Sequence, residues 1–397
     1  MGLDRSGPAG RPAAARMNTK KLFEDLMGHP LIGARPGLIL EMFRTRGVDR
    51  EYLGRAAKVL LLAVANAPFA IWEARRYGRQ IREHRLPGSP IFILGHWRSG
   101  TTHLHNLMSQ DPNFGVLTYL HAYFQNCALL DLGIHRSLLR LALPRTRPMD
   151  AVLLAADLPA EEEFAIACVD DVGIINGLWF PRALLNYLKE TVLFTGLDGS
   201  PDQAARQRWQ SAYSRVITKA SIASGGNRIL LLKNPANTGR VSTLLAMYPD
   251  ARFIYIHRNP YVVFPSTVRL YETLMSGRRF QRISTEDIEE IVLTLYHRII
   301  ERYEAERSRI PAGNLVELCF EDLEQEPLAV MESIYRSLEL KGFEQVRPRF
   351  EAYLGTVRMY RKNTYRIDKD LIRRIDARWD PVMQRWKYAP VAEGSAR

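Results

Sequence analysis

The sequence has very little cysteine. Cys127, Cys168 and Cys319 are widely separated along 397 residues, which excludes a disulfide framework and a zinc knuckle. We expect reduced, structural thiols and a cytoplasmic protein. The first residues are mostly Gly, Pro, Ala and Arg and lack an apolar core, so no secretory signal is expected. Residues 1–16 are predicted to form a disordered tail, and Met17 is a candidate for the true start.

A long apolar run is missing as well. The most apolar stretch, residues 59–72, spans 14 residues and contains Asn66 and Pro68, whereas a bilayer span needs about 20 apolar residues. The basic segment EARRYGRQIREHR, residues 73–85, follows it directly. We therefore expect a buried or interface-lying helix here, with peripheral membrane contact through residues 59–85.

The charge is strongly one-sided, because 55 Lys and Arg residues face 43 Asp and Glu residues, for a net charge of +12. Such a balance favours anionic partners: nucleotides, nucleic acid, acidic headgroups, or sulfated and phosphorylated groups. The basic residues are scattered and form no recognisable RNA or DNA module, so a nucleic-acid partner is not expected. With 46% hydrophobic residues the chain has the composition of an ordinary globular protein.

Four short apolar runs are bounded by turn-forming residues: 91–94, 229–232, 252–256 and 315–320. Continuous apolar runs of this length are typical of strands buried on both faces. Helical patterns separate them, most clearly over residues 287–306, where Ser284 and Asp287 form a capping box. Buried strands that alternate with helices predict an α/β fold with a central parallel sheet flanked by helices.

This pattern divides the chain into parts. Residues 17–89 are expected to form a helical N-terminal region, and residues 90–397 the domain that contains the sheet. Within that domain, about 117–227 lacks the strand–helix alternation and predicts a mainly helical insertion with a substrate pocket. The stretch 357–388 has little period and is expected to fold back over the sheet.

A glycine-containing loop lies between the first predicted strand and a helix. Gly95, Gly100 and Thr102 fit the phosphate-loop pattern G-x-x-x-x-G-K-[ST], whose backbone N–H groups hold phosphate at a helix N-terminus. Thr101 stands where that pattern has lysine, and the cation comes earlier, at Arg98. The loop predicts a P-loop-like, three-layer fold.

The residues after the other strands decide which anion the loop holds. A metal-dependent nucleoside triphosphatase needs an acid for Mg²⁺ after another strand, but residues 252–256 are followed by His257 and Arg258. The site therefore uses cations in place of a metal. The alternative is a metal-dependent kinase or nucleoside triphosphatase with a degenerate phosphate loop, which would use Glu321 and Asp322.

Three motifs together resemble the sulfotransferases that use 3′-phosphoadenosine 5′-phosphosulfate (PAPS). The segment Arg98-Ser99-Gly100-Thr101-Thr102 is similar to the family's 5′-phosphosulfate loop. Arg258 with Ser266 resembles its 3′-phosphate motif, and Lys233 before Asn-Pro resembles the catalytic lysine segment of the tyrosylprotein-sulfotransferase-like branch. All of them follow predicted strands, where open α/β sheets bind ligands.

The resemblance implies a bacterial-type sulfotransferase that moves the sulfuryl group of PAPS to a hydroxyl or amine of an acceptor, without a metal. Arg98 would contact the transferring group as well as the nucleotide, and Lys233 would stabilise the charge that grows on the bridging oxygen. Arg361 and Lys362 resemble part of the family's Arg-Lys-Gly loop on the 3′-phosphate. The acceptor is expected to be a small molecule or a lipid. The Leu, Phe and Tyr residues of the insertion point to an apolar alcohol or lipid, but they would equally line a core.

The catalytic base is left open. The acceptor must lose a proton as it attacks sulfur, so a histidine or carboxylate must come within about 3 Å of its hydroxyl. Residues 159–164, Pro-Ala-Glu-Glu-Glu-Phe, resemble a Pro-x-Glu-Asp-Glu-Phe segment of bacterial members, which points to Glu163 or Glu161. His121 is the third candidate.

Overall fold

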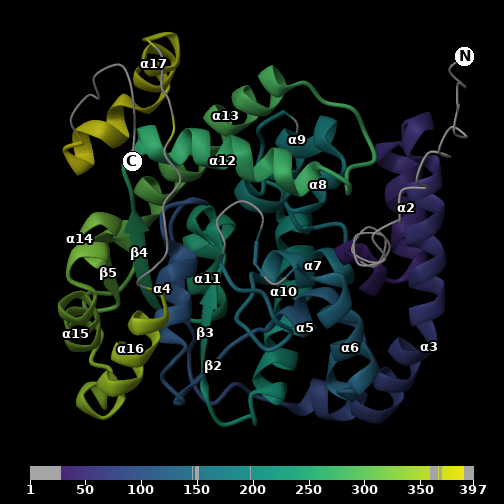
Figure 1. Ribbon diagram of the computed structural model, residues 1–397, viewed down its shortest axis with the longest axis horizontal. Helices are drawn as coiled ribbons and strands as arrows, with labels where there is room; N and C mark the ends of the chain where they lie inside the picture. The colour runs from purple at the N-terminus through teal and green to yellow at the C-terminus, as the bar shows by residue number, and fades with distance from the viewer. Residues whose placement is uncertain are drawn as a thin grey trace, which may run out of the picture.

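A five-stranded parallel sheet organises the chain (Figure 1). The computed structural model describes residues 28–144, 146–147, 152–196, 198–357, 365 and 369–388. The strands are β1 (Ile91–Leu94), β2 (Phe114–Gly115), β3 (Ile229–Lys233), β4 (Arg252–His257) and β5 (Leu315–Cys319). They lie in the order β2-β3-β1-β4-β5, and each neighbouring pair is parallel. The predicted α/β class is confirmed, and four strands match the apolar runs within one residue at each end.

Helices form the other layers. In chain order the α-helices are α2 (Pro36–Arg46), α3 (Leu53–Glu83), α4 (Thr101–Met108), α5 (Tyr119–Tyr123), α6 (Gly133–Ala142), α7 (Glu162–Val169), α8 (Asn176–Trp179), α9 (Leu184–Leu188), α10 (Gln203–Ala223), α11 (Val241–Met247), α12 (Pro260–Met275), α13 (Thr285–Glu306), α14 (Phe320–Gln325), α15 (Pro327–Ser337), α16 (Phe343–Val357) and α17 (Lys369–Trp386). The described residues between 117 and 227 form α5 to α10 and contribute no strand to the sheet.

The strands are apolar throughout because both faces of the sheet are covered. Side chains alternate between faces along a strand, so Ile91 and Ile93 pack with α4, α15 and α16, whereas Phe92 and Leu94 belong to the larger core that includes α10, α12 and α13. Figure 1 shows α15 and α16 on one side of the strands. This helix–sheet–helix layering is what the uninterrupted apolar runs require.

The sequence made expectations about the start of α13 and about the region of α17, and the structure tests both. The Oγ of Ser284 accepts the N–H of Asp287 at 3.1 Å at the start of α13, so the predicted cap is present. Residues 357–388 were expected to have little period, but they contain α17, whose buried Ile375, Trp379, Val382 and Met383 recur at helical spacing. Trp379 of this stripe stacks on Tyr296 of α13 with ring centroids 3.9 Å apart.

Helix α3 is much longer than the apolar run that marked it. It continues through the basic segment to Glu83. With the turn before it, Arg50–Glu83 is the one helical stretch in the described ranges that is long and apolar enough to cross a membrane, by length and composition only. Only 22% of its most apolar 18 residues is buried in the protein.

The topology also sets the place of the site. From β1 the chain adds β2 and β3 on one side of the sheet and β4 and β5 on the other. In such sheets the crevice lies beyond the carboxyl ends of the strands where the order divides. The loops after β1, β3 and β4 therefore meet at one edge.

Candidate active site

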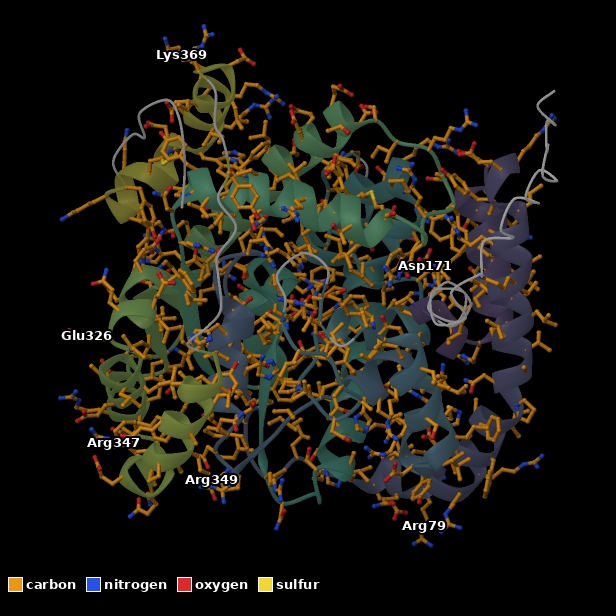
Figure 2. The ribbon with its side chains drawn as sticks, in the orientation of Figure 1. Arg79, Asp171, Glu326, Arg347, Arg349 and Lys369 are labelled. Atoms are coloured by element: carbon orange, nitrogen blue, oxygen red, sulfur yellow. The ribbon has the colours of Figure 1, made fainter. Side chains whose placement is uncertain are left out.

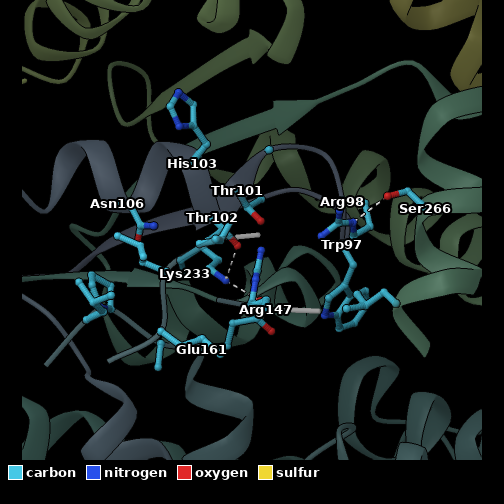
Figure 3. A pocket seen from close by; sticks show the side chains of 18 of the residues that line it. Trp97, Arg98, Thr101, Thr102, His103, Asn106, Arg147, Glu161, Lys233 and Ser266 are labelled. Atoms are coloured by element: carbon cyan, nitrogen blue, oxygen red, sulfur yellow. Dashed lines mark hydrogen bonds and ion pairs between the residues drawn. The ribbon is translucent and has the colours of Figure 1, made fainter. Parts of the chain in front are cut away.

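A cavity of about 2020 Å³ lies at that edge. Part of its lining comes from the loop after β1, the end of β3 and the residues after β4 (Figure 3). Another part comes from Leu143, Pro144, Arg147, residues 152–154 and 157–161, and α8. Pockets for one small molecule usually have volumes of about 300–1,000 Å³. The cavity therefore has room for two substrates side by side.

The loop after β1 has the backbone of an anion site. Gly100 is the N-cap of α4 with φ of +93°, and a Cβ there would lie 2.1 Å from the Phe320 ring. Arg98 has φ of +71°, in the left-handed region that non-glycine residues rarely adopt. The first N–H groups of a helix have no carbonyl partner within it. Because Thr101, Thr102 and Gly100 all line the cavity, these donors face it.

A second cationic cluster lies beside this loop. The Nε of Arg98 donates to the Oγ of Ser266 at 2.8 Å, and the Tyr365 hydroxyl approaches the same oxygen at 3.2 Å. Arg258 donates to the carbonyl of Arg98 at 3.4 Å and lies over the Phe320 ring at 4.3 Å. Two guanidinium groups and a serine from three elements thus meet at one end of the cavity, as the sequence predicted for a phosphate.

Lys233 lies between this cationic end and the rest of the cavity. Its ammonium binds Glu161 at 2.5 Å and approaches the Thr102 hydroxyl at 3.4 Å. Figure 3 shows Arg147 beside this pair. Burial lowers the pKa of Lys233 and the Arg147 guanidinium lowers it further, whereas Glu161 raises it. The side chains of Lys233 and Glu161 are only 3% and 14% exposed, so water weakens their attraction little.

The three consecutive glutamates bind different groups: Glu161 and Glu162 bind two groups of Lys233, and Glu163 binds Arg240. Glu162 accepts the backbone N–H of Lys233 at 2.9 Å. Glu163 binds the Arg240 guanidinium and accepts the Ile174 N–H at 3.0 Å, and it is 1% exposed. Glu161, the N-cap of α7, lines the cavity. Of the two glutamates proposed as the base, Glu163 is held in a buried ion pair and Glu161 is the one placed at the cavity.

The other sequence candidates lie elsewhere. His121 is hydrogen-bonded to Thr118 at 2.8 Å and lines a separate 250 Å³ pocket with Asp111, and burial lowers its pKa to about 4. Arg361 and Lys362 lie outside the described residues, as does the N-terminal tail. No group of three or more His, Cys, Asp or Glu side chains in the described ranges could hold a metal ion.

Sequence reasoning missed two side chains of this cavity. Arg147 lies between α6 and α7, and Tyr365 lies between α16 and α17. Neither is part of a motif or follows a strand, so no local signal marked them. Only the tertiary fold brings them to Lys233 and Ser266 respectively.

The far half of the cavity is apolar. Tyr119, Leu143, Leu154, Phe164, Ile175 and Trp179 are among the side chains that line it. They come from the expected insertion and its flanking loops, which the sequence indicated as the place of a substrate pocket. The lining of the cavity also includes Asp157 and Arg278. The six apolar side chains fit a molecule with an apolar part whose reactive end meets Lys233.

Comparisons with known proteins agree with this geometry. The sulfotransferase family model matches residues 90–171 and 184–345. The omega-hydroxy-beta-dihydromenaquinone-9 sulfotransferases Stf3 of Mycobacterium bovis and Mycobacterium tuberculosis are each 27% identical over 329 residues, covering 82% of this chain and 82% of the relative.

Two solved structures share the fold. Sulfotransferase STF9 from Mycobacterium avium aligns with a TM-score of 0.65 at 18% identity, covering 98% of this chain and 100% of that chain. Sulfotransferase STF1 from Mycobacterium tuberculosis aligns with a TM-score of 0.60 at 18% identity, covering 86% of this chain and 93% of that chain.

The buried carboxyl of Glu162 makes stability depend on pH. Burial raises its pKa from 4.5 to about 8, against the opposing effect of the Lys233 N–H and ammonium. Between these values the folded protein holds a proton that the unfolded chain releases, so this group lowers the free energy of unfolding as pH rises. We expect the stability of Glu162→Gln relative to wild type to increase steadily from pH 5 to pH 8, measured by urea denaturation.

The exposed Glu344→Gln serves as the control, because its side chain is 70% exposed and should show no such trend. A stability difference between Glu162→Gln and wild type that stays constant over this pH range would contradict a neutral Glu162.

Proposed function

The chain belongs to the sulfotransferase family, and from this premise we propose that it moves the sulfuryl group of PAPS to the hydroxyl of a long apolar alcohol. The observation that carries the proposal is the position of the Lys233–Glu161 pair. It lies between the phosphate-binding loop and the apolar half of one cavity. The alternative, a metal-dependent kinase or nucleoside triphosphatase, is not supported by the relatives.

The cationic end of the cavity is suited to the nucleotide. The N–H groups at the start of α4 would hold the 5′-phosphate, with Thr101 and Thr102 as further donors. Arg258 and Ser266 would hold the 3′-phosphate that distinguishes PAPS from ATP, and Arg98 joins the two sites through Ser266. Charge-assisted bonds of this kind are strong because the acceptor oxygens are ionised.

The transfer needs a proton acceptor and a stabilised leaving group. The acceptor oxygen attacks sulfur and forms the new S–O bond, while the bond from sulfur to the bridging oxygen breaks and its electron pair stays on the departing phosphate. Glu161 takes the hydroxyl proton. The Lys233 ammonium stabilises the charge that grows on the bridging oxygen, in a buried place where that attraction is strong.

The acceptor class follows from the far half of the cavity and from the relatives. That half is lined by aliphatic and aromatic side chains. The Mycobacterium relatives carry names that describe sulfation of an omega-hydroxylated dihydromenaquinone. A substrate with a terminal hydroxyl and an apolar chain would place its oxygen at Glu161 and bury its chain among Leu143, Leu154 and Trp179.

Removing the ammonium should separate catalysis from binding. We expect Lys233→Ala to lower kcat by roughly 10²-fold or more while the affinity for adenosine 3′,5′-bisphosphate changes little, because the charge acts mainly in the transition state. Arg258→Ala should show the reverse, weaker bisphosphate binding with a smaller loss of kcat. The measurement is steady-state transfer from labelled PAPS together with calorimetric titration.

Lys341→Ala, an exposed lysine in the described region, is the matched control and should retain wild-type turnover. A Lys233→Ala enzyme with normal kcat would remove Lys233 from the chemical step.

The apolar half should make acceptor chain length matter. For a series of primary alcohols we expect kcat/KM to rise by about fourfold for each added methylene, since burying one CH₂ contributes about 0.8 kcal/mol. The rise should stop when the cavity is filled. Labelled PAPS and alcohols of increasing length measure this directly, and a kcat/KM that is independent of chain length would exclude an apolar acceptor.

A further inference from the structure

The exposed hydrophobic side chains are concentrated on one side of the protein. Nine large hydrophobic side chains are exposed in the described residues: Leu53, Leu61, Val64, Ile71 and Trp72 on α3, Ile134 and Leu141 on α6, Leu40 on α2, and Leu153. Helices α2, α3 and α6 are neighbours. His135 of α6 approaches Asn66 of α3 at 3.1 Å, and α2 packs on α3. Eight of the nine therefore belong to three adjacent helices.

On α3 these side chains form a single stripe. Leu61, Val64 and Ile71 recur at helical spacing and are 68%, 51% and 52% exposed. The opposite side of the helix is buried in the protein through Ala56, Val59 and Ala63. An exposed apolar patch this extended marks an interaction surface.

Buried polar contacts hold α3 to the body of the protein along its length. Glu73 binds Lys219 of α10 at 2.5 Å, with both side chains at most 1% exposed, and accepts the Leu129 N–H at 2.7 Å. Breaking such a buried pair is strongly destabilising. Although α3 is long enough to cross a bilayer, these anchors fix it against the protein with its stripe outward, which is the arrangement of a helix lying on a surface.

The stripe runs into a basic end. Five arginines are exposed at the end of α3 and just beyond it: Arg75, Arg76, Arg79, Arg82 and Arg85. The exposed acid among them is Glu83, which pairs with Arg79 at 2.9 Å. An anionic bilayer offers an apolar layer and negative headgroups on one surface, and so matches both parts of this face.

We propose that α3 and α6, with Leu40 of α2, form a docking face for anionic lipid bilayers, in which the apolar stripe inserts at the headgroup level and the arginines bind the headgroups. This inference goes beyond the proposed function and does not depend on the acceptor. Helix α3 then lies parallel to the membrane plane, because its other side remains packed on the protein.

The docking face also leads to the cavity, a point that rests on the proposed function. Leu141 is exposed at the end of α6, and two residues later Leu143 lines the apolar half of the cavity. Leu153, the ninth exposed side chain, lines the same cavity. A lipid acceptor bound to the membrane would therefore meet the cavity wall next to the docking face.

Co-sedimentation of the full chain with vesicles tests the docking face. Vesicles of phosphatidylcholine with phosphatidylglycerol should bind the protein, and binding should weaken with salt. Each arginine near an anionic surface contributes about fivefold, so Arg75/Arg76/Arg79→Gln should weaken binding about 100-fold. Leu61→Gln and Ile71→Gln should each weaken it about tenfold, because each removes one inserted apolar side chain.

The matched control is Arg336/Arg347/Arg349→Gln, which replaces three arginines that are exposed on α15 and α16. Figure 2 shows Arg347 and Arg349 on the opposite side of the molecule from Arg79. This control should bind vesicles like wild type. Leu61→Met should do so as well, which separates loss of the apolar side chain from a folding defect.

Two results would overturn the docking face. One is the absence of wild-type binding to vesicles with phosphatidylglycerol. If the protein is then a dimer and Leu61→Gln makes it a monomer, the face is a contact between two copies of the chain and not a membrane surface. The other is equal loss of binding in the control triple. Titration of the same variants with adenosine 3′,5′-bisphosphate tests the proposed function separately. The affinity for the bisphosphate should be the same as in wild type.

Discussion

Three adjacent carboxylates fix the helical insertion to the end of β3 and to the turn that follows it, Pro235–Arg240. Glu161 binds the Lys233 ammonium, Glu162 accepts the Lys233 N–H, and Glu163 binds Arg240. All three belong to the start of α7, so this helix cannot shift against the strand without breaking them together. The loop after β1 and the apolar part of the same cavity both adjoin this junction. The relative position of the two substrates therefore depends on it.

The junction is stable because its charges balance. Glu163 faces Arg240 in a pair that is at most 1% exposed, and such a pair is tolerated only when both partners are satisfied. Glu162 adds no further charge to the buried Glu163–Arg240 pair. Burial raises the pKa of Glu162 to about 8, so its carboxyl is mostly neutral near pH 7. Lys233 and Glu161 are left facing the cavity. Burial lowers the pKa of Lys233, and the same exclusion of water strengthens the attraction of its ammonium for a transferring anion.

Much of this arrangement could be predicted from local patterns. The apolar runs located four strands within one residue. The glycine loop, Lys233 and Arg258 lie at the carboxyl ends of strands, where the sequence pattern puts them. The sequence could not decide which glutamate faces the cavity. Glu161 is the N-cap of α7 and lies before its first helical residue, so helical spacing does not predict where its side chain points. Arg147 reaches the site from the chain between α6 and α7. The outward face of α3 depends on which side of the helix Lys219 and its neighbours cover. Those are tertiary facts without a local signal.

Recognition of a 3′-phosphate by Arg258 and Ser266 is the central claim, because it distinguishes a PAPS enzyme from an ATP enzyme built on the same loop. The direct measurement is calorimetric titration with adenosine 3′,5′-bisphosphate, AMP and Mg-ATP. The account predicts that the bisphosphate binds about 10- to 100-fold more tightly than AMP, since the extra phosphate gains charge-assisted hydrogen bonds. Equal binding of AMP and the bisphosphate, or a preference for Mg-ATP, would contradict it.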